Sequence, residues 1–203
     1  MSGGRTRGRR GGSRSGGLRL RHPLLWLATL GFVAVLIGAA FALGVFGGGG
    51  DKPAYPYPVQ TFDDLGREHL AVGEVYDQYN SNPPTSGPHA PSPAPWGVSD
   101  TELPEEVPIH NMEHGGVVIW YDCQGGASPL GSAGCQQLRD QLAAIVRPAV
   151  AAGKEVLMTP YSGMTNRIAL TAWQTLDAFD DFDQARIEAF MASYERRFNP
   201  ENF

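Results

Sequence analysis

Residues 23–46 carry no charged side chain and are predominantly apolar, so they divide the chain before any domain fold is considered. About 20 consecutive apolar residues are enough to cross the hydrocarbon core of a bilayer as a helix. Residues 1–22 contain seven arginines and no acidic residue, and basic residues beside a span stay on the cytoplasmic side. The pattern predicts a basic cytoplasmic tail, a transmembrane anchor at residues 23–46 and a C-terminal part outside the membrane.

A cleaved signal peptide is the alternative interpretation of the same segment, because residues 40–42 (Ala-Phe-Ala) have the small-x-small form of a cleavage site. The apolar cores of signal peptides usually run only about 7–15 residues, so the length favours an uncleaved anchor. Residues 47–58 are rich in Gly and Pro and predict a flexible linker. Residues 59–203 then form one extracytoplasmic domain of ordinary size.

The charge of the chain changes sign after the apolar segment. The whole sequence carries −5, and the seven arginines of residues 1–22 therefore leave −12 for residues 51–203. Binding to nucleic acid depends on Lys and Arg that neutralise phosphates, so this part is not expected to bind it. The expected partners are the membrane itself and an unidentified ligand or protein of the cell envelope.

Cys123 and Cys135 are the two cysteines of the sequence, and both follow the predicted anchor. An even number of cysteines in an oxidising compartment predicts a disulfide. Closing the flexible loop between them would constrain the unfolded chain by about 3 kcal/mol.

The second half of the domain has the clearest periodicity. Residues 117–121 and 155–159 are typical of buried strands, and residues 167–173 of a third strand. Between the first two lies a helical pattern, with a stop at Gly153 and a proline expected to bend or shorten it. Its apolar positions are Leu138, Leu142, Ile145, Val146 and Ala149. Strand, helix and strand predict a parallel crossover.

A last helix is expected with Asp181 as its N-cap and an apolar face made of Ile187, Phe190, Met191, Tyr194 and Phe198. The first half is less regular: residues 69–72 and 75–76 suit short strands, and residues 83–108 form a long Pro-rich passage. The predicted fold is an α+β domain with a small mixed sheet and two main helices.

The histidines that follow the anchor fall in one stretch: His69, His89, His110 and His114. Imidazole is a common ligand of zinc and copper and exchanges protons near neutral pH. His110 and His114 would be about 6 Å apart on a helical turn and about 13 Å apart in a strand. They can therefore share an ion only if the chain turns between them, which the following Gly115-Gly116 favours.

His89 ends the segment Asn82-Pro83-Pro84-Thr85-Ser86-Gly87-Pro88-His89, whose prolines reduce the entropy lost on ordering it. Thr85, Ser86 and Gly87 could offer backbone N–H groups to an anion. The alternative is a packed loop in which His89 hydrogen-bonds to a backbone carbonyl.

We take His89, His110 and His114 as the main candidate metal ligands, with His69 and Glu113 as possible additions. A hydrogen-bonded structural role is the alternative for His69, and an exposed or capping role for Glu113. Met112 could add a sulfur ligand that favours copper, although a methionine at such a position more often fills the core.

These motifs also carry a family resemblance: the residue 82–89 segment, His110-Asn111-Met112-Glu113-His114-Gly115-Gly116-Val117-Val118, Thr159-Pro160-Tyr161, residues 168–173 and Asn199-Pro200-Glu201. Over roughly residues 69–201 the chain resembles the bacterial domain-of-unknown-function family 3105. That resemblance implies an N-terminal membrane anchor and an extracytoplasmic domain. It implies no established activity.

Three functions are compatible with these observations. The first is an extracytoplasmic domain that binds zinc or copper through the histidine cluster. The second is a binding or scaffolding module of the cell envelope with structural histidines and a groove lined by Trp96 and tyrosines. The third is a hydrolase that uses Glu113 or a histidine as base, with or without a metal-bound water. The sequence does not decide whether the protein is an enzyme, and it does not identify the metal.

Overall fold

The computed structural model describes residues 52–198. The predicted cytoplasmic tail, the anchor at residues 23–46 and most of the linker lie outside this range. Within residues 52–198, no helix combines the length and the apolar character needed to cross a membrane.

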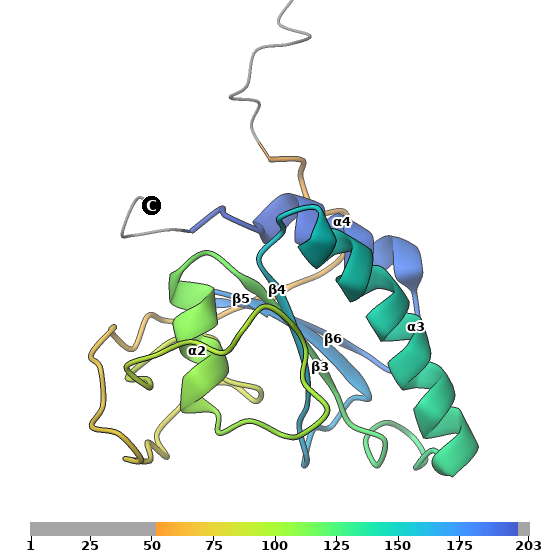
Figure 1. Cartoon of the computed structure of the whole chain (residues 1–203), viewed down its shortest axis with the longest axis horizontal. Coiled ribbons are helices and arrows are strands. Elements are labelled where there is room, and N and C mark those ends of the chain that lie inside the picture. The colour runs from red at the N-terminus through yellow and green to blue at the C-terminus, as the bar shows by residue number, and fades with distance from the viewer. Residues whose placement is uncertain (1–51, 199–203) are drawn as a thin grey trace, which may run out of the picture. The chain divides into compact units, whose positions relative to one another are not determined.

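One mixed sheet of six strands forms the centre of the domain (Figure 1), in the order β1-β6-β5-β3-β4-β2. The strands are β1 (Gln60–Thr61), β2 (Gly97–Val98), β3 (Val117–Tyr121), β4 (Val156–Pro160), β5 (Ile168–Ala172) and β6 (Thr175–Phe179). β4 is parallel to both β3 and β2, whereas β5, β6 and β1 continue the other side in antiparallel pairs. The α+β class and the mixed sheet are confirmed.

Helices cover both faces of the sheet. Figure 1 shows α3 (Ser132–Ala151) and α4 (Gln184–Tyr194) on one side of it and α2 (Glu106–Glu113) on the other. The described residues therefore contain three helices, where the sequence predicted two. The additional helix, α2, contains the second histidine motif.

The uniformly apolar sequence of the central strand β3 follows from its burial on both faces of the sheet. Val117, Ile119 and Tyr121 pack in the hydrophobic cluster under α3 and α4. Val118 and Trp120 point the other way, into the cluster that contains residues of α2. Successive side chains of a strand alternate between faces. A strand covered on both faces is therefore apolar at every position.

The periodic half of the domain agrees with the sequence prediction, apart from details at the helix ends. β3, α3 and β4 form the predicted parallel crossover. Pro148 does not end α3, which continues to Ala151. The N-cap of α4 is Asp183, which accepts a hydrogen bond from the Arg186 N–H, and not Asp181 as predicted. Asp183 takes this role because its carboxylate lies three residues before that free N–H.

The expected strands at residues 69–72 and 75–76 do not form. His69 makes one isolated bridge with His89, and the chain then turns at residues 71–74, where the Glu74 N–H donates to the Ala71 carbonyl over 2.9 Å. Cys123 and Cys135 form the predicted disulfide, which joins the end of β3 to α3.

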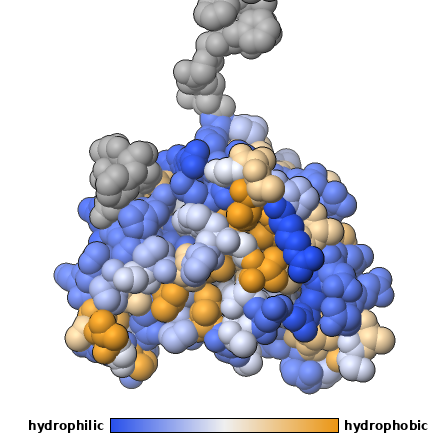
Figure 2. All heavy atoms as spheres, viewed as in Figure 1, coloured by the Kyte–Doolittle hydropathy of each residue, from blue (hydrophilic) through white to orange (hydrophobic). Residues whose placement is uncertain are grey.

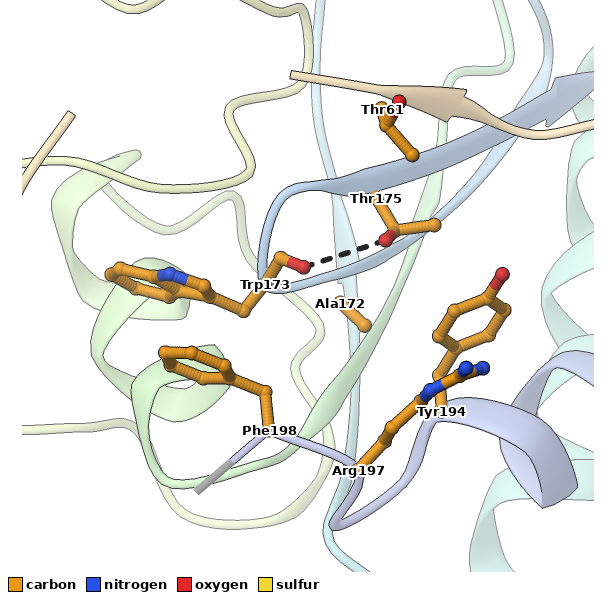
Figure 3. A pocket seen from close by; sticks show the side chains of 7 residues that line it. All are labelled: Thr61, Ala172, Trp173, Thr175, Tyr194, Arg197 and Phe198. Atoms are coloured by element: carbon orange, nitrogen blue, oxygen red, sulfur yellow. Dashed lines mark hydrogen bonds between the residues drawn. The ribbon is translucent and has the colours of Figure 1, made fainter. Parts of the chain in front are cut away.

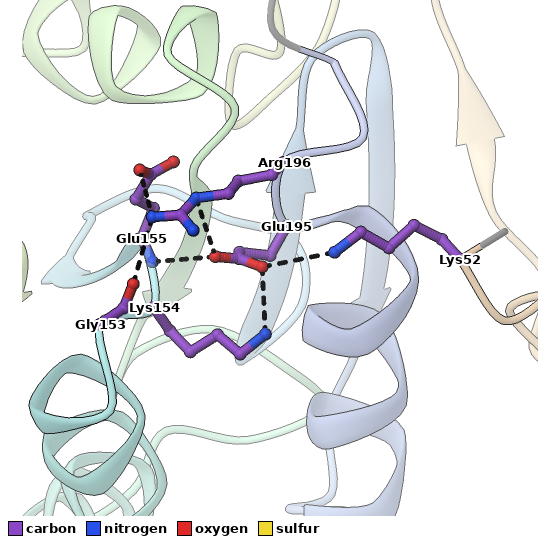
Figure 4. A network of polar contacts seen from close by, with 6 residues as sticks. All are labelled: Lys52, Gly153, Lys154, Glu155, Glu195 and Arg196. Atoms are coloured by element: carbon purple, nitrogen blue, oxygen red, sulfur yellow. Dashed lines mark hydrogen bonds and ion pairs between the residues drawn. The ribbon is translucent and has the colours of Figure 1, made fainter. Parts of the chain in front are cut away.

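The turn after α4 is fixed by a buried carboxylate, Glu195, whose side chain is 2% exposed. Lys52 and Lys154 approach it over 3.5 and 3.2 Å, and the Glu155 N–H donates to it over 3.4 Å (Figure 4). Burial alone would raise the pKa of the Glu195 carboxyl, but these hydrogen bonds and lysine charges outweigh it and hold that pKa below its ordinary value.

Candidate metal centre

Helix α2 has a polar sequence, and its C-terminal end is closed by backbone hydrogen bonds. Pro108 lies in the first turn, where its missing N–H costs no helical hydrogen bond. At the other end the Gly115 N–H donates to Met112 O and the Gly116 N–H to Asn111 O, both over 2.9 Å. This is the Schellman ending, with Gly115 at φ +89°.

Neither of the two glycines after His114 has room for a side chain. A Cβ on Gly115 would lie 2.8 Å from the Phe198 carbonyl oxygen, and one on Gly116 would lie 2.4 Å from the Trp96 ring. The Gly-Gly pair thus ends the helix directly after the motif and lets two other segments pack against it.

Each residue of the motif at 110–114 has a distinct role in the structure. The side-chain amide of Asn111 makes two hydrogen bonds to one residue of the Pro-rich passage. Its Nδ2 donates to Ala94 O and its Oδ1 accepts from the Ala94 N–H, both over 2.9 Å. Met112 is fully buried in the apolar cluster on this face of the sheet. His110, Glu113 and His114 remain for the site.

The loop that carries His89 is closed and internal. Thr85, Ser86 and His89 are fully buried. The Ser86 hydroxyl lies 3.3 Å from Asp63 O, to which it donates, and the Thr85 hydroxyl pairs with that of Ser81 over 3.1 Å. Gly87 has φ +125° and its Cα lies against the Tyr79 ring. These contacts hold the loop in one shape.

His69 reaches the same place through backbone pairing. The His89 N–H donates to Glu68 O over 3.0 Å, and the Leu70 N–H donates to His89 O over 2.8 Å. This bridge places the two imidazoles side by side, with ring centroids 5.0 Å apart. The His69 ring also stacks on that of His110 at 5.0 Å and 14°.

The three segments bring four candidate ligand atoms together. One atom each of His69, His89, His110 and Glu113 lies within 4.8 Å of all the others. His89 Nε2 is 3.0 Å and His69 Nε2 3.7 Å from Glu113 Oε2. His114 joins the group through His110, since their Nε2 atoms are 2.8 Å apart. At about 2.0–2.1 Å per bond, two ligands of one ion are about 3 Å apart, so the group needs only a small contraction.

The outer nitrogens of two imidazoles fix their tautomers. His89 Nδ1 lies 2.8 Å from Gly87 O, and His110 Nδ1 lies 2.7 Å from Ala90 O. A carbonyl oxygen only accepts, so both Nδ1 atoms carry the proton. In a neutral ring the Nε2 atom then holds a lone pair, and both Nε2 atoms point into the cluster. Metal-ligating histidines are oriented in this way by a carbonyl on the other nitrogen.

Burial favours the neutral state of His110. Desolvation lowers the pKa of His110, and the neighbouring His89, His114 and His69 lower it further, against the opposing effect of the hydrogen bond to Ala90. Trp173 closes the other side of His89, with its ring edge-on at 6.3 Å. The centre is therefore a largely buried group of imidazoles around a carboxylate, in which burial disfavours a charge on His110.

The structure brings together most of the candidate ligands named from the sequence, but it exchanges main candidates and possible additions. His89 and His110 lie at the centre as predicted. His69 and Glu113 belong to the group of four, whereas His114 contacts it through His110. Glu113 is 4% exposed, so the exposed or capping role considered for it is wrong. The signal for Glu113 was its position three residues after His110 on one helical turn.

One cavity of the domain has none of the clustered residues in its lining. It has a volume of about 390 Å³ and is lined by Thr61, Ala172, Trp173, Thr175, Tyr194, Arg197 and Phe198 (Figure 3). Trp173 stacks on Phe198 with centroids 5.2 Å apart. Trp96, which was expected to line a groove, packs over Gly116 instead. Trp173 is the residue that contacts both the cavity and His89.

Comparison with known proteins identifies a family but no activity. The model of a family described as "Protein of unknown function (DUF3105)" matches residues 74–202. The match includes His89, His110, Glu113 and His114 and begins after His69. No curated protein and no solved structure matches the chain.

Proposed function

This chain belongs to the DUF3105 family, and we propose that its domain binds a divalent transition metal ion through His89, His110, Glu113 and His69. One observation carries the proposal: imidazole lone pairs and a buried carboxylate converge within 4.8 Å. Hydrogen bonds to Gly87 and Ala90 leave the Nε2 atoms of His89 and His110 as acceptors in the neutral rings.

Acceptor atoms that face one another need a cation or protons between them. A neutral His89 directs a lone pair at the Glu113 carboxylate 3.0 Å away, which is repulsive. A protonated imidazole would remove this repulsion, but imidazoles this close together oppose charging several rings at once. A metal ion satisfies all the lone pairs together. His114 supports the site beside His110 or completes the coordination.

The ligand chemistry restricts the metal. Imidazole nitrogens with one carboxylate suit zinc and copper, and they suit Mg²⁺ or Ca²⁺ poorly because those ions prefer oxygen. Met112 is buried in the apolar cluster, which removes the argument for a thioether ligand. Zinc or copper therefore remains the proposed ion.

We also propose that the domain works outside the cell membrane, held there by residues 23–46. Support comes from the arginines of residues 1–22, the uncharged segment after them and a disulfide in the domain, which suits an oxidising compartment. In intact cells, added protease should then degrade the domain; full protection would contradict this location.

The metal proposal is tested with the purified full-length chain, stripped with a chelator and titrated with Zn²⁺ and Cu²⁺ by calorimetry. The wild type should bind one ion per chain. The double variant His89→Ala, His110→Ala should bind none at the same concentrations, because both removed rings supply buried Nε2 ligands.

Two matched controls separate ligation from general damage. His22→Ala removes the remaining histidine of the sequence and should bind metal like the wild type. Glu106→Gln alters a buried carboxylate on the same helix, which accepts from the Tyr76 N–H, and should also keep the ion, whereas Glu113→Gln should weaken it. A folded wild type that binds neither metal, judged by circular dichroism, would overturn the proposal.

A further inference from the structure

His69 differs from the other members of the group in its exposure. Its side chain is 47% exposed, whereas those of His89 and Glu113 are 0% and 5% exposed. On the basis of the proposed metal site, we propose that His69 is an exchangeable ligand, and that a small anion binds the ion at this open edge.

The attachment of His69 suits exchange. His89 and His110 are each fixed by a carbonyl on Nδ1, and Glu113 lies on a helix. His69 is held by a single backbone bridge, and residues 71–75 directly after it are all exposed. Its Nε2 is also farther from Glu113 Oε2 than that of His89, at 3.7 Å against 3.0 Å.

The surface beside His69 also carries exposed hydrophobic side chains. Val72 and Val75 are 91% and 78% exposed and are the large hydrophobic residues with the greatest exposure among residues 52–198. Figure 2 shows a small hydrophobic patch at the lower left, in the region of the loops that follow β1 in Figure 1. Residues 71–75 are exposed, so this part of the loop adds little to the core.

The charge of the site selects the incoming ligand. A divalent ion, one carboxylate and neutral imidazoles leave one uncompensated positive charge in a partly buried site, which is unfavourable. A small anion that coordinates at the open edge neutralises it. The net charge of −12 over residues 51–203 repels large polyanions. The proposed ligand class is therefore a small oxygen- or nitrogen-donor anion, such as hydroxide or a carboxylate.

An exchangeable position changes the class of the site. Structural zinc sites are closed by four protein ligands, whereas catalytic sites keep one position for water or substrate. With His69 displaced, the three buried residues His89, His110 and Glu113 supply the permanent ligands. The site then has the composition of a reactive centre.

The test uses the full-length chain loaded with Co²⁺, whose visible spectrum reports the coordination of the ion, and sodium azide as the anionic probe. Azide should change the wild-type spectrum with saturation. His69→Ala should still bind Co²⁺, more weakly by roughly the 10- to 100-fold typical of losing a supporting residue, and should bind azide at least about tenfold more tightly. Val72→Ala, which alters the same loop, should match the wild type.

The outcomes separate the two proposals. If Co²⁺ does not bind to the folded wild type, the metal proposal fails. If Co²⁺ binds but azide leaves the spectra of the wild type and of His69→Ala unchanged, the metal site is retained and the proposal that an anion binds beside His69 is wrong. Loss of all Co²⁺ binding in a folded His69→Ala protein would also overturn exchangeability, since His69 would then be a permanent ligand.

Discussion

Glu113 and Glu195 are both buried carboxylates, 4% and 1% exposed, and their surroundings are opposite. Glu195 is compensated by the chain itself, through Lys52, Lys154 and Arg196 (Figure 4). Glu113 faces imidazoles, and no Lys or Arg of residues 52–198 pairs with it. Buried charges are ordinarily paired or bound to metal. The contrast indicates that one carboxylate stabilises the fold, whereas the other is available to a ligand.

The largest expected effect follows from removing the ion. At a free concentration 1,000 times its dissociation constant, a metal bound only by the folded state adds about 4 kcal/mol to the free energy of unfolding. Glu113→Gln should lose most of this gain and Glu195→Gln should keep it. Without metal, Glu113→Gln should be at least as stable as the wild type, because it removes a buried carboxylate that no Lys or Arg of residues 52–198 compensates.

Chemical denaturation with and without chelator measures both parts of this prediction. A metal-free Glu113→Gln protein that is clearly less stable than the metal-free wild type would show that Glu113 is compensated within the fold. The comparison between the two carboxylates would then no longer hold.

Gly115 joins the end of the helix that carries Glu113 to the turn that carries Glu195, since its carbonyl accepts from the Arg196 N–H over 2.7 Å. Gly115→Ala should cost about 2 kcal/mol, from the left-handed backbone and from contact with the Phe198 carbonyl 2.8 Å away. Gly153→Ala is the control, because Gly153 has φ +80° and open space around it. It should cost about 1 kcal/mol. Equal losses in urea denaturation would mean that the close approach contributes nothing.

Glu195→Gln should give a smaller effect than Gly115→Ala, about 1.5 kcal/mol at neutral pH, since its lysine partners are 35% and 45% exposed and partly screened. The folded pKa of Glu195 lies below its ordinary value of 4.5, so its stabilisation is present above that pH and is lost as the pH falls through the folded pKa. The difference between wild type and variant should therefore narrow in acid. A difference independent of pH would contradict this assignment.

The helices and strands that could be predicted from the sequence are those whose buried side chains are apolar. β3, α3, β4, β5 and α4 all show hydrophobic periodicity or apolar runs. β6 was missed because Asp177 interrupts its pattern; this residue is 2% exposed and pairs with Arg186. β1 and β2 have two residues each, which is too short for any periodic signal.

Helix α2 was missed for a reason that concerns the site. Its residues are almost all buried, yet His110, Asn111 and Glu113 are polar. His110 and Asn111 hydrogen-bond to the backbone of the Pro-rich passage, and Glu113 lies 3.0 Å from His89 Nε2. Burial and hydrophobicity are therefore uncoupled in this helix. The histidine cluster itself was visible in the sequence. His69 was named as a possible addition to it, but its place beside His89 could not be predicted, because it depends on a backbone bridge between residues twenty positions apart that no local pattern encodes.

Strand β1 also has a mechanical consequence. Any tension applied to the chain ahead of residue 52 first loads the Lys52–Glu195 ion pair and the pairing of β1 with β6. His69 lies beyond both points along the chain. A pull on the linker would therefore have to separate these contacts, and those that Asp63 and Asp64 make after β1, before it reached the proposed exchangeable ligand.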